Sequence, residues 1–536
     1  MSLPDRNNPY NFDEYLTWRD KFNVYEDVPF IKQAMMRFAG SLSAEILQDV
    51  EQFAGRVSNE FKQLSDAAGD HNKAPYMVHF DGHNNRIDRI VRPSETLELE
   101  KAVWNEAVFS EGVDPWTRFM KIYLLTTLGE AGINCAHCCT GGLNLLLERF
   151  ADTPELKRIH QHLTQGIDGE YGIAAQFLSE IQGGSDVAAN LVEAIETDGQ
   201  WRIYGNKFYC SASHSDYSVI TAKPAGSEEV GLFVVPSWLP GDKAKEKRNR
   251  YTINKIKSKL GTRELPTGEI QYNGAVAYPI GPLNRGIANI VGIVLSHSRF
   301  ISGLGPGAQM MRVGEEAKQY ANLRTAFGTT IKDFGLVAAQ LKKIDLYSQR
   351  TTAASFKLQS EILKNEQLDK GEPVFASSNK SEALTKQHKY HVRMLIMLHK
   401  MVATTDAVLV SEQAMSIFGG HGLMEDFSSH PRLYRDASTL AGAWEGPKNL
   451  LLTRIFMDLQ LGAKWYPTPE FVANLLTGAP QETIMEMTRR LDEFMEHGTL
   501  MGNDDKTIEI CEKWEAFCFD FMHVYQDVAC EEVKAG

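Results

Sequence analysis

Glu445 is the side chain whose type and neighbours best suit acid–base chemistry. It stands between Trp444 and Gly446. A carboxyl group held in an apolar slot beside an aromatic ring has its pKa raised towards neutrality by desolvation, and it can then accept a proton from a weakly acidic carbon. The alternative is a structural role, because Pro447 is typical of a first helical turn that Glu445 would cap. The two interpretations are compatible.

A loop rich in glycine and serine, residues 178–186, could bring its backbone close to a ligand. Its sequence is Leu178-Ser179-Glu180-Ile181-Gln182-Gly183-Gly184-Ser185-Asp186. Glycines let the main chain approach a bound group, and the hydroxyls and amides can donate hydrogen bonds to phosphate or carbonyl oxygens. Taken alone, such a loop is more typical of an ordinary surface turn.

Three further motifs combine small residues with groups that suit phosphate and ring recognition. They are Gly205-Asn206-Lys207-Phe208-Tyr209-Cys210-Ser211, Arg324-Thr325-Ala326-Phe327-Gly328 and Gly419-Gly420-His421-Gly422. A guanidinium group binds phosphate as a fork, an aromatic side chain covers a planar ring, and glycine amides allow close approach. Each motif alone indicates no more than a packed hairpin or turn.

Together with Arg435-Asp436 upstream of Glu445, these motifs resemble those of the acyl-CoA dehydrogenase family of flavoproteins. The resemblance implies that Glu445 is the catalytic base and that FAD is the cofactor. It also implies that Ser185, Arg299 and Gly446 contact the substrate. The FAD contacts that it implies are Leu178, Ser179, Gly184, Ser185, Tyr209, Ser211, Arg324, Phe327, Gly420 and Asn449.

The resemblance also implies the reaction. Glu445 would remove the α proton of an acyl-CoA thioester, the flavin would accept the β hydride, and an electron-transferring flavoprotein would receive the electrons. The Ser211 hydroxyl would polarise flavin N5. The chain departs from the family pattern at Ile181, Ser416 and Pro447, where Pro, Gln and Thr are usual. Some FAD contacts are therefore expected to differ.

One branch of the family, the AidB-like flavoproteins of the bacterial alkylation response, resembles the chain further and offers a rival function. Segments 179–187 and 257–263 are similar to that branch. Its members bind DNA through a basic surface, largely near the C-terminus. Here residues 461–536 hold six Lys or Arg and fifteen Asp or Glu. Such a tail repels phosphates, so nucleic-acid binding is not expected.

Two alternatives stay open beside these. The basic segment 243–263 contains nine Lys or Arg and one acid. It is interpreted first as a solvated loop, second as a contact with the phosphates of CoA, and last as a contact with DNA. A flavin oxygenase or nitroalkane-type oxidase could use the same fold. Glu445 argues against the oxygenase and against the nitroalkane oxidase, because the oxygenases generally lack Glu at this position and the nitroalkane enzymes carry Asp.

Composition bounds the class of protein. The chain has 536 residues, 43% hydrophobic and 23% charged, with a net charge of −13. These values are typical of a globular protein of two to four domains and argue weakly against general nucleic-acid binding. Cys135, Cys138 and Cys139 surround His137 but lack a second ligand pair, so we predict no metal site. Without a signal peptide or a long apolar run, a cytoplasmic location and no membrane span are expected.

Hydrophobic periodicity predicts the elements that position these motifs. We expect an α+β protein of the acyl-CoA dehydrogenase type with four parts. These are an N-terminal helical domain (1–160), a middle β-barrel domain (161–285), a C-terminal four-helix bundle (286–462) and an acidic helical extension (463–536). The run Gly303–Gly307 is interpreted as a bend in a helical hairpin. The resemblance at 324–328 implies a homodimer or homotetramer.

Overall fold

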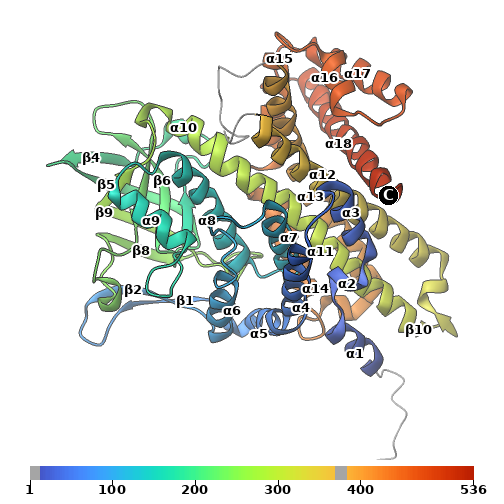
Figure 1. The fold of residues 1–536 in the computed structure, drawn as a ribbon, viewed down its shortest axis with the longest axis horizontal. Coiled ribbons are helices and arrows are strands. Elements are labelled where there is room, and N and C mark those ends of the chain that lie inside the picture. The colour runs from blue at the N-terminus through green and yellow to red at the C-terminus, as the bar shows by residue number, and fades with distance from the viewer. Residues whose placement is uncertain (1–11, 369–382) are drawn as a thin grey trace, which may run out of the picture.

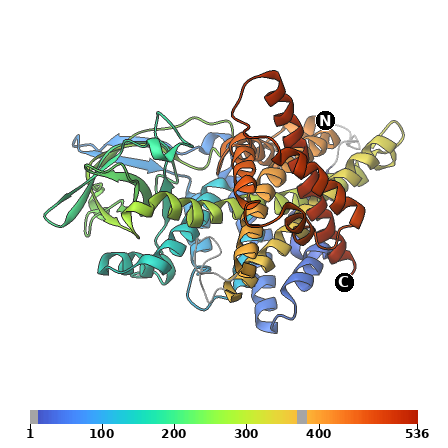
Figure 2. The ribbon, with the colours of Figure 1, turned by 90° about the horizontal axis from the view of Figure 1, so that it is seen from above.

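The computed structural model describes residues 12–368 and 383–536. The polar stretch at the N-terminus and the first two residues of the helix expected from residue 381 lie outside this part. The described chain forms a β domain flanked by helices, with a helical extension on the far side (Figures 1 and 2). The expected α+β fold is confirmed, whereas the four domain boundaries stay predictions.

The N-terminal part is helical, as predicted, apart from one hairpin. Strands β1 (Tyr76–Phe80) and β2 (Arg86–Val91) pair antiparallel within the region that we expected to be wholly helical. Asp81 closes the turn between them by accepting hydrogen bonds from His83 N and Asn85 N. The helices are α1 (Asp13–Lys21), α2 (Val24–Asp27), α3 (Pro29–Ala39), α4 (Ala44–Arg56), α5 (Lys62–Ala68), α6 (Ser94–Trp104), α7 (Pro115–Thr126), α8 (Ala131–Phe150) and α9 (Pro154–Thr164).

The middle part is a closed sheet. Its strands are β3 (Ala174–Phe177), β4 (Glu193–Thr197), β5 (Gln200–Ser211), β6 (Tyr217–Pro224), β7 (Gly231–Pro236), β8 (Tyr251–Ile256) and β9 (Thr267–Pro279). The order β3-β6-β4-β5-β9-β7 closes because β7 also pairs with β6. Asp198 and Gly199, both at positive φ, form the tight turn between β4 and β5. The six-residue strand β8 lies in the basic segment 243–263, so that part of the segment is sheet and not the loop that we expected.

Long helices form the C-terminal part. They are α10 (Gly286–Asn289), α11 (Ser296–Leu323), α12 (Gly335–Leu368), α13 (Ala383–Phe418), α14 (His430–Ala443) and α15 (Lys448–Gly462), with the short hairpin β10 (Thr325–Ala326) and β11 (Thr329–Thr330). The run Gly303–Gly307 lies inside α11, so the expected bend was wrong. A Cβ at Gly303 would lie 2.7 Å from His399, and one at Gly307 would lie 3.0 Å from Thr352. These glycines therefore let α11 pack closely against α13 and α12.

Two helical stretches, Leu283–Leu323 and Leu384–Leu423, are long and apolar enough to cross a bilayer. In the relevant windows 50% and 83% of the residues are buried within the fold. Packing against neighbouring helices explains their apolar composition.

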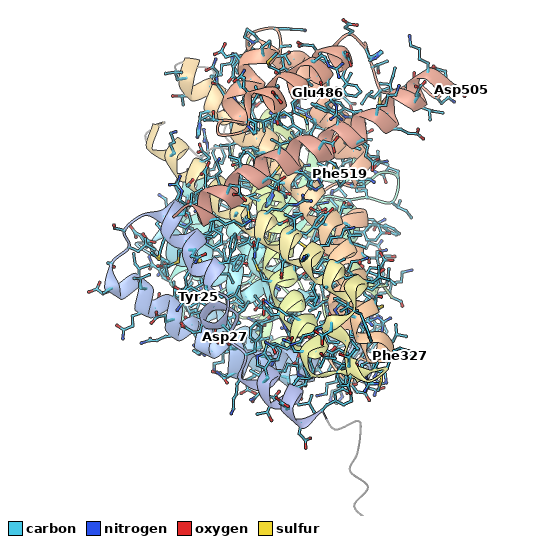
Figure 3. The ribbon with its side chains drawn as sticks, turned by 90° about the vertical axis from the view of Figure 1, so that its right-hand side faces the viewer. Tyr25, Asp27, Phe327, Glu486, Asp505 and Phe519 are labelled. Carbon is cyan, nitrogen blue, oxygen red and sulfur yellow. The ribbon has the colours of Figure 1, made fainter. Side chains whose placement is uncertain are left out.

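The C-terminal extension packs against the bundle. It comprises α16 (Thr468–Leu475), α17 (Gln481–Met495) and α18 (Asp505–Lys534). Trp514 of α18 is buried, and its indole N–H donates to Leu452 O at 3.1 Å. Figure 3 shows α18 lying across the long helices, with Asp505 at its projecting end and Glu486 on the neighbouring α17, and both side chains are exposed. The acidic charge therefore faces solvent while the aromatic face is buried.

Candidate active site

Glu445 lies in the short connection between α14 and α15, in an unusual backbone conformation. Its φ is +56° and that of Gly446 is +98°. A left-handed conformation is disfavoured for a residue with a side chain, so neighbouring groups must hold it. Arg299 Nε of α11 donates to Glu445 O at 3.0 Å. Lys400 Nζ of α13 donates to Gly446 O at 3.0 Å.

The carboxyl group of Glu445 is largely withdrawn from water. Its Oε1 accepts a hydrogen bond from Gln176 Nε2 of β3 at 3.1 Å. Its Oε2 is buried and has no partner among the described residues. Burial raises the pKa of Glu445 to about 7, although the positive charges of Arg299 and Lys400 lower it. A carboxyl group with such a pKa can act as a base at neutral pH.

A cavity opens beside this carboxyl group. Its empty space is about 690 Å³, with the solvent-open mouth included. Its walls come from α7, α8, α11, α14 and the connections around them, and the residues nearest Glu445 include Trp444 and Cys138. The cysteines noted in the sequence thus lie on α8, and Cys135, Cys138 and Cys139 all line this cavity. Burial raises the pKa of the Cys138 thiol. A hydrogen bond with Cys135 and burial raise the pKa of the Cys139 thiol, so the thiolate form of these two residues is disfavoured.

Asp436 lines the cavity and interacts with two other buried carboxyl groups, Glu264 and Glu130. Asp436 Oδ1 accepts from Thr262 N. Burial and the neighbouring Glu264 charge raise the pKa of Asp436, and the same two causes raise that of Glu130. Arg432 is close to Glu264, with 3.7 Å between its NH1 and the carboxylate. The Asp of the Arg-Asp motif therefore anchors the loop at Thr262 to α14.

A buried ion pair holds the glycine- and serine-rich loop. Lys207 is 1% exposed. Its Nζ donates to Glu180 Oε1 at 2.7 Å, Leu178 O at 3.1 Å and Thr221 Oγ1 at 3.0 Å. The Phe208 N–H also donates to Ser179 O at 2.9 Å. The first two sequence motifs are therefore joined into one unit on the β domain.

The structure places the remaining predicted residues of this unit near its surface. Gly184 and Ser185 are exposed, and a Cβ at Gly184 would lie 3.3 Å from the Ser179 hydroxyl. Tyr209 is 57% exposed, with Lys257 Nζ 4.4 Å from its ring centre. Ser211 ends β5, and its hydroxyl lies 3.4 Å from that of Thr267. The exposed Ser185, the half-buried Ser179 and Ser211 hydroxyls, the close approach at Gly184 and the partly exposed Tyr209 ring suit a planar polar ligand.

A second group of predicted residues lies elsewhere. Arg324 follows the end of α11, about 37 Å along that helix from Arg299 at the usual rise per residue. Phe327, on the adjoining hairpin, is 98% exposed at a φ of +52°. Figure 3 shows it at the end of the long helices away from the extension. Gly420 is exposed. It lies near the same end of α11, because the hydroxyl of Tyr320 on α11 forms a 3.0 Å hydrogen bond with the neighbouring His421. These residues do not join Glu445 within one chain.

Two side chains near Glu445, Gln176 and Lys400, belong to none of the sequence motifs and were not predicted as site residues. Gln176 precedes the glycine- and serine-rich loop, and its amide oxygen in turn accepts from Ser298 Oγ at 3.4 Å. Lys400 offered one sequence signal, a lysine within the mostly apolar stretch 394–403. Asn449 was predicted to contact FAD. Its Oδ1 accepts from Leu450 N at 2.9 Å on the exposed first turn of α15.

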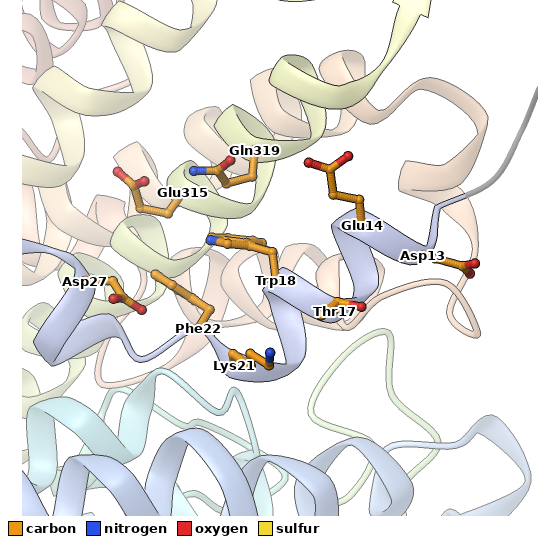
Figure 4. Close-up of a pocket in the computed structure, with 9 residues that line it drawn as sticks. All are labelled: Asp13, Glu14, Thr17, Trp18, Lys21, Phe22, Asp27, Glu315 and Gln319. Carbon is orange, nitrogen blue, oxygen red and sulfur yellow. The ribbon is translucent and has the colours of Figure 1, made fainter.

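A separate surface groove lies between α1, α2 and α11 (Figure 4). Trp18 and Phe22 form its floor beside Glu315 and Gln319. Glu315 is about 24 Å along α11 from Arg299. The groove is thus remote from Glu445 and none of the sequence motifs lines it.

The comparisons with known proteins agree with this fold and site. The middle domain of acyl-CoA dehydrogenases matches residues 175–275, and their C-terminal domain matches residues 284–459. Together these matches span just over half of the chain. The sheet, the bundle and a carboxylate between them define a protein of the flavin-dependent dehydrogenase class. The chain belongs to the acyl-CoA dehydrogenase family, as predicted.

Two curated relatives extend the match. Acyl-CoA dehydrogenase family member 11 of Caenorhabditis elegans is 26% identical over 459 residues, which cover 80% of this chain and 69% of the relative. AidB of Escherichia coli is 26% identical over 464 residues, which cover 83% of this chain and 79% of AidB. The two similarities are equal in identity and do not separate the branches.

Solved structures show the same fold. The apo-form of Bd2924 has a TM-score of 0.81 at 22% identity and covers 96% of this chain and 98% of its own. Caenorhabditis elegans ACDH-11 in complex with C11-CoA has a TM-score of 0.76 at 21% identity, with 96% and 91% covered. A Bacillus anthracis acyl-CoA dehydrogenase complexed with FAD has a TM-score of 0.64 at 15% identity, with 92% and 81% covered. Family members bind FAD, so the expected flavin is confirmed at the family level.

Proposed function

We propose that this protein oxidises an acyl-CoA thioester between its α and β carbons, with Glu445 as the base. One observation carries the proposal. The buried Glu445 carboxyl group, with a pKa of about 7 and an unpartnered oxygen, lines a cavity beside Trp444. A structural helix cap would be exposed and would need no raised pKa. The complex of ACDH-11 with C11-CoA supports a thioester as the substrate.

The residues of the β domain suit a flavin. We propose that Leu178, Ser179, Gly184, Ser185, Tyr209 and Ser211 hold FAD, together with Asn449. The serine hydroxyls and the open tyrosine face have the donors and the flat apolar surface that such a ring system requires. FAD bound there would supply the acceptor for a hydride from the β carbon.

The chain's own residues supply the acid–base part. Glu445 would take the α proton onto the Oε2 atom that has no partner. Gln176 would keep the carboxyl group oriented through its bond to Oε1. Arg299, which is buried and holds the carbonyl of Glu445, would fix the turn beside the thioester. The amide of Gly446 and the Ser185 hydroxyl complete the substrate contacts that we propose.

An anaerobic titration tests the function. Purified protein would be mixed with butanoyl-, octanoyl-, isovaleryl- and phenylpropanoyl-CoA while the visible flavin spectrum is followed. Bleaching by one of these thioesters supports the proposal and gives the substrate class. A bound flavin that none of them bleaches would contradict it.

We further propose that the active form is a homodimer or homotetramer. Phe327 is 98% exposed on a short hairpin, where a neighbouring subunit would bury its apolar ring. In a symmetric assembly Arg324, Phe327 and Gly420 would reach the FAD of a neighbouring subunit. An electron-transferring flavoprotein would then accept the electrons.

The rival function, a DNA-associated flavoprotein, has less support. Most charges of the basic segment are already engaged within the chain. Lys243 pairs with Asp216 at 2.8 Å, and Lys257 pairs with Glu269 at 2.7 Å. Arg248 stacks on Trp238 with 4.6 Å to the ring centre. A salt-dependent shift of duplex DNA by the purified protein would favour this rival.

A further inference from the structure

Lys400 is a buried cation that the chemistry above does not use. It lies on α13 and is 1% exposed. Its neighbours along the chain, such as Met397 and Met401, are buried and apolar. A charged group is retained in such surroundings only when it is paired or hydrogen-bonded. Its ammonium group donates to Gly446 O at 3.0 Å.

The bond from Lys400 is one half of a clamp on the turn that carries Glu445. Arg299, from α11, donates to the carbonyl of Glu445, and Lys400, from α13, donates to the next carbonyl along the chain. Both residues of the turn are left-handed, at φ +56° and +98°. The first is strained because it carries a Cβ. The two cations, one from α11 and one from α13, therefore stabilise a left-handed turn that the α14–α15 connection would not keep without them.

The direction of the Glu445 side chain depends on this turn. A relaxed backbone at residue 445 would swing the Cα–Cβ bond away and separate the carboxyl group from Gln176 and from the cavity. We propose that Lys400 is a positioning residue for Glu445, whose ammonium group fixes the left-handed turn and so aims the carboxylate at the substrate. The inference rests on the proposed function and deepens it.

The charges around Glu445 give this role a pH signature. Arg299 faces it from α11, Lys400 from α13, and the thiols of Cys138 and Cys139 from α8. Gln176 donates from β3. Since the two cations lower the pKa of Glu445 against its burial, loss of Lys400 raises that pKa further above 7. The proton-accepting form then becomes scarcer at neutral pH.

Three substitutions separate charge, hydrogen bonding and packing. Lys400→Met keeps an unbranched side chain of nearly the same length but removes the charge and the donor. Lys400→Arg keeps both. Thr404→Ala, one turn further along α13, is the matched control, because the Thr404 hydroxyl is buried and bonds only to carbonyls of its own helix.

The test uses FAD-loaded protein and whichever thioester of the panel bleaches the flavin fastest. The bleaching rate is measured against pH with normal and α-deuterated substrate. We expect Lys400→Met to be at least about tenfold slower at neutral pH, since small misplacements of a reacting group cost about that much or more. We also expect an alkaline shift of the profile and a larger isotope effect. Lys400→Arg and Thr404→Ala stay within about threefold of the wild type.

A uniform loss of rate in Lys400→Met, with the pH midpoint and isotope effect unchanged, overturns the positioning role. If that variant does not fold, Lys400→Gln removes the charge but keeps a polar donor, so an unchanged bleaching rate and pH midpoint in this variant overturn the positioning role instead. A wild-type flavin that no thioester bleaches overturns the proposed function and the positioning role together. A bleached wild type with an unaltered Lys400→Met overturns the positioning role alone.

Discussion

At the scale of single residues, the site works through burial and through the charges that oppose it. The Glu445 carboxyl group is made more basic by desolvation and less basic by Arg299 and Lys400. The balance gives a pKa of about 7, which suits proton transfer near neutral pH. The pKa values of Asp436 and Glu130 are also raised, in their case by burial and by the negative charge of Glu264.

Glu130 gives the first prediction, which concerns stability. Because its pKa is raised in the folded state, the proton that it binds stabilises the fold at low pH, and this stability is lost as pH rises through the raised pKa. Glu130→Gln has no proton to lose as pH rises, so it removes this pH-dependent loss of stability, and its amide oxygen still accepts from Ile133 N. Between about pH 5 and pH 9 we expect the free energy of unfolding to decrease in the wild type by about 1–3 kcal/mol more than it does in Glu130→Gln.

Urea denaturation at several pH values measures this difference. Glu228→Gln is the control, because the Glu228 side chain is 99% exposed. Parallel pH profiles for wild type and Glu130→Gln would show that the buried carboxyl group is not the cause.

The residue types at the site were foreseeable, but their partners were not. Glu445 with Trp444 could be singled out from the sequence because both stand in one short motif. Lys400 is 45 residues upstream in the middle of an apolar helix, and only the packing of α13 brings it to Gly446. Gln176 reaches Glu445 across a separation of 269 residues. Contacts between distant elements leave no local pattern to read.

At the scale of elements, β5 and the loop before β4 act as one body. Lys207, inside β5, bonds to two residues of the loop and to Thr221 of β6. Burial lowers the pKa of Lys207 to about 8, although Glu180 raises it. The sequence pattern predicted a β domain over residues 161–285, yet the segment that forms β8 was expected to be a loop and the β1–β2 hairpin was not expected. Those strands are short and lie in segments rich in charge, which obscures the alternation.

Lys207→Met tests the importance of this pair. The change leaves the Glu180 charge buried without its cation, and loss of one partner of a buried pair costs about 3–5 kcal/mol. We expect a lower free energy of unfolding and weaker FAD retention, because the loop that carries Ser179 and Ser185 loses its anchor. Denaturation and flavin fluorescence after dilution measure the two effects.

The control is Lys223→Met on β6, whose ammonium group pairs with the exposed Glu228 at 3.2 Å. Surface pairs contribute little, on the order of 0–1 kcal/mol. Equal losses in the two lysine variants would contradict the anchoring role of Lys207.

At the scale of the whole molecule, the extension covers one end of the long helices, and the other end leaves an aromatic side chain exposed. The extension buries Trp514 against α15 and leaves its acidic face outside. The β10–β11 hairpin instead leaves Phe327 open to solvent. The family resemblance predicted an assembly through this motif, but the sequence could not show how far it lies from Glu445.

Phe327→Ala tests that assembly. Burial of a phenylalanine side chain is worth about 1.5–3 kcal/mol, so the variant should associate more weakly and hold FAD at least about tenfold less tightly. Analytical ultracentrifugation and flavin titration measure these effects. Met501→Ala, which alters a residue 80% exposed on the extension, should change neither. Unchanged assembly and FAD affinity in Phe327→Ala would rule out a subunit contact there.

The most direct measurement of the central claim compares wild type with Glu445→Gln in anaerobic single-turnover bleaching by an acyl-CoA. For the wild type we predict a rate that rises with pH and levels off above a midpoint near the Glu445 pKa of about 7. For Glu445→Gln, with FAD still bound, we predict a rate lower by a factor of about 10²–10⁴, the usual contribution of a general base, and without that midpoint. A glutamine variant that bleaches as fast as the wild type would show that another group removes the proton.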